Sequence, residues 1–197
     1  MTPQTDIFPK VRYLLNDETT PYRWKDSELI DWVNECLNVM VDIRPDLFNS
    51  QTTYTCTLGV EQVCTFDRMR TIQEIVQVVN GPAVLGTDRQ LLDRFRPNWF
   101  NDTPAQAINW MPHGESYKKF YVYPPAPDGQ QLIVRFVQAH APLTAATDSI
   151  SIPENYAPAV TAYVVARAEA KDDEQINANR MQQFLSDFAG MIKAGDK

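Results

Sequence analysis

The spacing of apolar residues changes twice along this chain, and this change restricts the fold more than any other feature. Near both ends, apolar residues recur at three- and four-residue steps, the period of an amphipathic helix. From residue 51 to residue 140 they mostly alternate with polar residues, the period of a half-buried strand. The order predicts an α+β fold, in which a helical bundle built from the N- and C-terminal segments contains an inserted antiparallel β-rich region.

The clearest expected helix is capped by Asp26 or Ser27 and ends before Arg44-Pro45, because the residue that precedes a proline is pushed out of helical angles. Its expected apolar face is Leu29, Val33, Cys36, Leu37, Met40 and Val41. A shorter helix is expected before it, with Pro9 in the first turn. Beyond residue 153 the pattern predicts an alanine-rich helix and then a last helix. The apolar face of the last helix is Ile176, Met181, Phe184, Leu185, Phe188 and Ile192.

A length of 197 residues predicts a single domain. Its helical part is expected to comprise residues 1–48 and 153–197, and its β-rich insertion residues 51–140. We expect a further short strand at residues 148–152, close to the start of the alanine-rich helix.

The stretch "KKFYVYPPAPDGQQLIVRF" (Lys118–Phe136) has alternating residues on both sides of Asp128-Gly129, which predicts a β-hairpin. Its prolines would stiffen the tip, and the alternative is a polyproline peptide presented to a partner. A second hairpin is expected earlier, with "TYTCTL" (53–58) as one strand, "GVEQ" as the turn and "VCTF" as the returning strand.

A short helix is expected to begin at Thr87 or Asp88, with Leu91, Leu92 and Phe95 as its apolar residues. The irregular segment 96–116 that follows contains Trp99, Phe100 and Trp110. Structureless segments of this length are uncommon in compact domains and usually have a function. Two interpretations remain open: an aromatic flap that covers a sheet face, or a surface for binding.

The net charge of −7 disfavours a large phosphate-binding surface, because nonspecific binding of nucleic acid depends on clustered Lys and Arg. A surface that repels DNA remains compatible with it. The three cysteines form no C-x-x-C pair and are expected to be reduced, although Cys56 and Cys64 could face each other across a hairpin.

No nucleophile, zinc, phosphate-loop or dinucleotide motif is found, so no cofactor, metal or catalytic residue is expected. Glu28, Asp31 and Glu35 follow one side of the second helix. They could act as a carboxylate site, but such a stripe is more often the solvated face of an amphipathic helix. The two histidines, His113 and His140, are expected at the surface.

Four segments occur in the order seen in a family of bacteriophage virion proteins: "YRWKDSELIDWVNECLNVMVDIRPDLF" (22–48), "TDRQLLDRFRPNW" (87–99), "KFYVYPPAPDG" (119–129) and "DSISIPENYAPAVTAYVVARAEAKDDEQINANRMQQFLSDF" (148–188). The chain resembles the head-to-tail adaptors, also called connector or tail tubular proteins, of short-tailed phages. The resemblance spans nearly the whole chain, and none of its motifs is catalytic.

The resemblance implies a structural virion protein that forms a ring, usually of twelve copies, between the portal and the tail nozzle and extends the DNA channel. The implied partners are the portal protein, a tail nozzle or tail fibre protein and further copies of the chain. Genomic DNA would pass through without sequence-specific binding, and no membrane is involved. The implied location is the portal vertex of the virion, after assembly in the host cytoplasm.

Particular aromatic and apolar residues are expected at the subunit interface and at the portal. Trp99, Phe100 and Trp110 are candidates for the subunit interface, where aromatic residues are favoured. Phe184, Phe188, Met191 and Ile192 of the last helix are candidates for portal contact, the alternative being ordinary bundle core.

Three other functions are considered. The chain could be another head-completion or tail-terminator ring protein, a small carboxylate-based enzyme that uses the acidic stripe, or a protein that presents its prolines to a partner.

Overall fold

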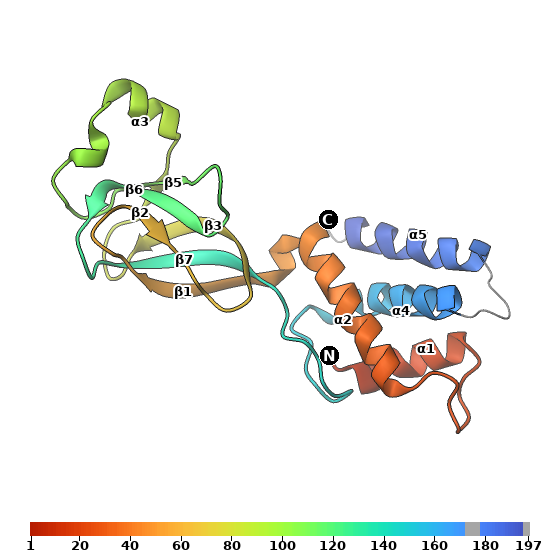
Figure 1. Cartoon of the computed structure of the whole chain (residues 1–197). Helices are drawn as coiled ribbons and strands as arrows, with labels where there is room; N and C mark the ends of the chain where they lie inside the picture. Colours follow the sequence, from red (N-terminus) through yellow and green to blue (C-terminus); the bar gives the residue numbers. More distant parts are fainter. Residues whose placement is uncertain (172–177, 195–197) are drawn as a thin grey trace. The chain divides into compact units, whose positions relative to one another are not determined.

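A computed structural model of the chain describes residues 1–171 and 178–194 (Figure 1). The chain divides into two compact units: the helical unit, Met1–Phe48 with His140–Lys197, and the β unit, Asn49–Ala139. The α+β class predicted from the changing period is confirmed. Whether the two units behave as one domain stays a prediction.

The helical unit contains α1 (Phe8–Leu14), α2 (Asp26–Ile43), α4 (Ala157–Lys171) and α5 (Ala178–Ala194). Shorter helical turns are formed by Pro3–Ile7, Pro45–Phe48 and Glu154–Tyr156. Pro9 lies in the first turn of α1, as expected. Ile176, predicted on the last helix, lies outside the described residues.

Helix α2 has the predicted length and end, but its cap is one residue earlier than expected. Lys25 occupies the N-cap position, and its backbone N–H donates to the Glu28 carboxylate at 3.3 Å. The backbone of Arg44 has left helical angles, as the following Pro45 requires. The predicted apolar face is buried: Leu29, Val33, Cys36, Leu37, Met40 and Val41.

Helix α4 lies at the centre of the helical unit and contacts α1, α2 and α5. Its small residues permit this close approach, and Ala159, Ala166 and Ala168 are almost fully buried. Because nearly every side of α4 meets another helix, it has no wide solvated face.

The strand expected at residues 148–152 does not form. Ile150 and Ile152 are buried in an extended segment. The Ile150 N–H donates to the Met1 carbonyl at 2.9 Å, and the Gln4 N–H donates to the Ala146 carbonyl at 2.9 Å. The apolar-polar alternation here thus reflects packing against the N-terminal turn rather than a sheet.

The β unit contains two sheets. One has the order β1-β7-β3, formed by Asn49–Thr55, Gln131–Gln138 and Met69–Val78, all antiparallel. The other has the order β2-β6-β5-β4, formed by Gly59–Val63, Lys119–Ala126, Asn109–Pro112 and Leu85–Gly86. Only β4 and β5 pair in parallel among these strands. The main core of the unit includes residues from both sheets, among them Phe120 and Val122 of β6 and Leu132, Val134 and Phe136 of β7.

Both predicted hairpins are wrong. β6 and β7 flank the expected turn but belong to different sheets, and so do β1 and β2. The "GVEQ" turn is itself part of β2. Cys56 explains the course of the chain near Gly129: its N–H donates to the Gln130 carbonyl at 2.7 Å, and its carbonyl accepts from Gly129 N at 3.0 Å. These bonds lead β7 toward β1 instead of back along β6.

Two of the three prolines of the stretch Lys118–Phe136 are part of the sheet rather than a presented peptide. Pro124 and Pro125 lie inside β6, and Pro125 is buried. Its carbonyl accepts from the Ala105 N–H at 2.9 Å. The interpretation as a polyproline ligand is therefore wrong, because a docking peptide must be exposed.

Truncation of a buried side chain tests the assigned core of the β unit. Leu132 is fully buried on the central strand β7. We expect Leu132→Ala to lower the free energy of unfolding by about 2–5 kcal/mol, from lost burial and the cavity left behind. Urea denaturation followed by circular dichroism measures the change. Leu58→Ala, at an exposed leucine of the same unit, is the control, and equal losses would contradict the assigned core.

The three cysteines are free and buried. Burial raises the pKa of Cys56 and of Cys64 to about 12, so neither thiol ionises near neutral pH. We expect the folded chain to react with a thiol reagent at least about tenfold more slowly than the unfolded chain. A Leu58→Cys variant, exposed on the same unit, should react at once, and fast labelling of the unsubstituted chain would contradict the structure.

Candidate functional site

An apolar groove of about 490 Å³ lies between three helices of the helical unit. Helix α1 lines it with Pro9, Lys10, Tyr13 and Leu14, helix α4 with Pro158, Thr161 and Ala162, and helix α5 with Phe184, Asp187 and Met191. Tyr13 and Met191 are 67% and 41% exposed, which is unusual for side chains of this size. The volume lies in the range typical of binding pockets.

Small side chains on α4 explain why the surface is hollow here. Ala162 is too short to fill the space between α1 and α5. The Thr161 hydroxyl donates to the Ala157 carbonyl at 2.9 Å, so that it is satisfied within its own helix. The larger side chains of the flanking helices therefore form walls around an apolar floor.

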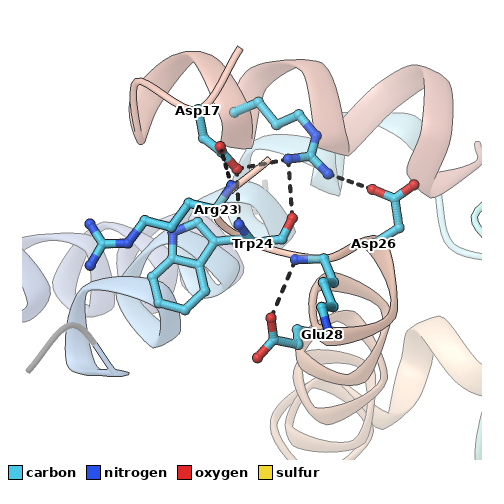
Figure 2. A network of polar contacts seen from close by, with 7 residues as sticks. Asp17, Arg23, Trp24, Asp26 and Glu28 are labelled. Atoms are coloured by element: carbon cyan, nitrogen blue, oxygen red, sulfur yellow. Dashed lines mark hydrogen bonds and ion pairs between the residues drawn. The ribbon is translucent and has the colours of Figure 1, made fainter. Parts of the chain in front are cut away.

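A buried arginine holds the α1 wall in place (Figure 2). Arg12 Nη1 donates to Asp17 Oδ2 at 2.8 Å and to the Trp24 carbonyl at 3.2 Å, while Nη2 pairs with Asp26 at the start of α2. The guanidinium also lies 3.6 Å from the centre of the Tyr22 ring. One side chain thus connects α1 to the chain that enters α2.

Asp17 completes this network from the other side. Its carboxylate accepts from the backbone N–H of Arg23 at 2.7 Å and of Trp24 at 3.2 Å, as Figure 2 shows. Both Arg12 and Asp17 are more than nine-tenths buried. A buried charge pair is costly unless hydrogen bonds satisfy it, and here they do.

Two further arginines fix the α5 wall. Arg180 pairs with Glu169 of α4 at 3.1 Å and donates to the Leu14 carbonyl at the end of α1. Arg44, which follows α2, donates to the Ile192 carbonyl at 2.8 Å. The Tyr163 and Phe188 rings pack with centroids 5.1 Å apart between α4 and α5. The three helices around the groove are therefore cross-connected.

The charge of the chain is concentrated in one unit. The β unit has eight acidic and eight basic residues, so its formal charge is zero. The helical unit has seventeen acidic and ten basic residues, which account for the whole net charge of −7. The acidity predicted to repel DNA is thus a property of the helical unit alone.

The acidic stripe on α2 does not form a carboxylate pair. Glu28 pairs with Lys171, and Glu35 pairs with Arg167 at 3.0 Å, both on α4. The Lys171 ammonium lowers the pKa of Glu28 below its usual value. These ion pairs connect α2 to α4, so the two glutamates have structural partners. Residues 1–171 and 178–194 contain no cluster of metal-ligating side chains.

The aromatic segment is divided between two places. Trp99 is fully buried, where it packs against Tyr121 and Tyr123 of β6, and its Nε1 donates to Asp93 at 2.7 Å. Phe100 stacks on Trp99 with centroids 4.0 Å apart and is 43% exposed, whereas Trp110 packs on the main core. Trp99 thus behaves as the flap interpretation predicts, and Phe100 offers the accessible surface. The role of the three residues at a subunit interface stays a prediction.

The four candidates for portal contact also separate. Phe184 and Met191 line the groove, while Phe188 and Ile192 are buried in the bundle. Phe188 and Ile192 thus belong to the core. Contact of these four residues with a portal stays a prediction.

Sequence reasoning missed the accessible apolar residues of α3 (Arg89–Phe95). Leu91 and Phe95 were predicted only as apolar residues of this helix, and the structure leaves them 52% and 75% exposed. Only the half-buried Leu92 packs inward. The remaining signal in the sequence is the i, i+4 spacing of Leu91 and Phe95, which places both on one side of the helix.

In the described part of the chain, no helix is both long and apolar enough to cross a bilayer.

Comparison with known families identifies a matching family model. The family model described as "SU10 adaptor protein" matches residues 3–197. A sequence search of curated proteins finds no match.

Substitution of Arg12 tests the network that positions the groove. Arg12→Met keeps much of the side-chain volume but leaves the Asp17 carboxylate buried without its cation, so we expect a loss of about 3–5 kcal/mol in the free energy of unfolding. Urea denaturation measures it. The double variant Arg12→Met/Asp17→Asn removes the stranded charge and should recover part of the loss. A single variant as stable as the unsubstituted protein would contradict the assigned network.

Proposed function

The chain belongs to the SU10 adaptor protein family, and on this premise we propose that it is a head-to-tail adaptor that forms a ring between the portal and the tail nozzle of a phage virion. The observation that supports the proposal most strongly is the family match, which extends over nearly the whole chain. Membership makes the chain a phage adaptor-type structural protein. The ring, its number of copies and its position at the portal are our proposal.

The proposed ring contains twelve copies and extends the DNA channel of the portal. Its partners are the portal protein on one side and a tail nozzle or tail fibre protein on the other. It is assembled in the host cytoplasm and remains at the portal vertex of the virion. The ion pairs and hydrogen bonds that connect the helices of the helical unit give the kind of framework that a structural role requires.

The charge distribution supports passage of DNA without binding. Twelve copies at −7 would sum to about −84, all of it from the helical units. A wall with the same sign as the phosphates lets DNA slide, because it offers no cluster of cations to hold the backbone.

We propose that assembly depends on the portal. The acidic helical units repel one another in free solution, which disfavours spontaneous ring formation. A portal ring would place the subunits side by side and so offset this repulsion by mass action. Free subunits are then monomeric.

A second candidate is another head-completion or tail-terminator ring protein. It shares the ring architecture but differs in position. Labelling the chain in intact virions distinguishes the two, since an adaptor contacts the portal directly and a terminator lies at the far end of a tail tube.

The test is the mass of the purified chain, first alone and then mixed with its portal ring, by native mass spectrometry and single-particle imaging. We expect a monomer alone and a closed collar of twelve copies on the portal. A portal ring from an unrelated phage is the control. A chain that forms no collar on its own portal would overturn the proposal.

A further inference from the structure

Helix α3 is held firmly on the β unit although it buries none of its own residues. The Asp88 side chain caps it by accepting from the Gln90 N–H at 2.9 Å. Asp93 pairs with Arg89 within the helix at 3.4 Å. Two contacts connect the helix to the rest of the unit: Asp93 accepts from Nε1 of the buried Trp99 at 2.7 Å, and the Arg89 guanidinium lies 5.0 Å from the centre of the Tyr121 ring of β6. Figure 1 shows the helix standing away from the strands of its unit.

The outer side of α3 is apolar with one cation. Leu91 and Phe95 lie one turn apart, and both side chains are more than half exposed. Arg94, between them, is exposed and forms no ion pair with a carboxylate of the described residues. We call Leu91, Arg94 and Phe95 the α3 knob. A short helix that is fixed in place and displays i, i+4 apolar side chains has the form of a helix that enters a groove.

The groove of the helical unit has the complementary character. It is apolar along its floor, and its lining includes the exposed Asp187 of α5. Asp187, like Arg94, forms no ion pair within the described residues. Lys10 is the only cation of the lining and lies on the α1 wall, one turn from Asp6.

We propose that the α3 knob of one copy of this chain binds in the groove of the next copy, with Phe95 and Leu91 on the apolar floor and Arg94 opposite Asp187. The charges of the two units favour a second copy of the chain as the occupant of the groove. Contact between two helical units would bring −7 against −7, whereas contact of a β unit with a helical unit brings zero against −7.

The contact joins two different surfaces, so it is heterologous. Such contacts either close into a ring or continue into an open filament. The inference therefore deepens the proposed function and rests on it for ring closure. It also assigns Phe184 and Met191 to the neighbouring copy in place of the portal.

Cross-linking gives the direct test. One chain contains Phe95→Cys and the other Met191→Cys, both at exposed positions, and the native thiols are buried. The two chains are mixed on portal rings and treated with a short bis-maleimide. We expect a covalent dimer of one chain of each kind. Pairing Phe95→Cys with Ser186→Cys, which is exposed on α5 and absent from the groove lining, is the matched control.

Substitution measures how much the α3 knob contributes to ring formation. Phe95→Glu should lower the fraction of portal rings with a full collar at least about tenfold, as for a residue at the centre of an interface. Leu58→Glu, at an exposed leucine elsewhere on the β unit, should leave that fraction unchanged. Arg94→Glu and Asp187→Arg should each reduce collar formation, and their combination should restore it.

The outcomes separate this inference from the proposed function. If the unsubstituted chain forms collars and Phe95→Glu forms them equally well, the contact is overturned and the adaptor function stands. If Met191→Glu prevents even single copies from binding the portal while Phe95→Glu does not, the groove belongs to the portal and the inference is wrong. A chain that contains both Phe95→Cys and Met191→Cys is treated in the same way. If it cross-links only within itself and forms no link between chains, the proposed contact is also overturned.

If the unsubstituted chain forms no collar on its portal, the proposed adaptor function is contradicted, and the contact needs a separate test. The same cysteine pair is then cross-linked in concentrated free protein. A dimer between chains would support the contact without a portal, and its absence would overturn the contact too.

Discussion

Burial of α4 is the constraint on which the helical unit depends. This helix is covered by α1 and α2 from the N-terminal segment and by α5 from the C-terminal segment. Its neighbours therefore come from both sides of the β unit in the sequence, because the chain leaves the bundle at Phe48 and returns at His140. The helical unit thus forms only when segments from the two ends of the chain pack together.

Charged side chains connect the helices of that bundle to one another. Arg12 connects α1 to the start of α2, and Arg44 and Arg180 connect helices that are distant in sequence. Each of the three bonds a backbone carbonyl as well as a carboxylate. The ion pairs of Glu28 and Glu35 with α4 act in the same direction. Because these groups are satisfied inside the unit, the apolar groove between α1, α4 and α5 is left as an accessible apolar surface for a partner. In an assembly of like-charged subunits, that partner is best supplied by a surface without net charge.

Prediction from sequence succeeded where a residue's neighbours in the chain decide its environment. The span and buried face of α2, its end at Arg44-Pro45 and the start of α3 close to Asp88 all follow from local spacing. It failed where contacts with distant segments of the chain determine that environment. Both hairpins were wrong because alternation specifies which face of a strand is buried but not which strand lies beside it. Ile150 and Ile152 alternate for burial without belonging to a sheet.

The candidate site shows the same division. The sequence alone determined the α+β order, the acidity, the lack of a catalytic motif and a resemblance to phage adaptors, because these depend on composition, period and motif order. Only the tertiary structure decided that Phe188 and Ile192 are core while Phe184 and Met191 line a groove, and that Trp99 is buried while Leu91 and Phe95 are exposed. The hydrophobic effect is non-directional and depends on the apolar area removed from water, so the type of an apolar residue cannot tell whether its own chain or another one covers it.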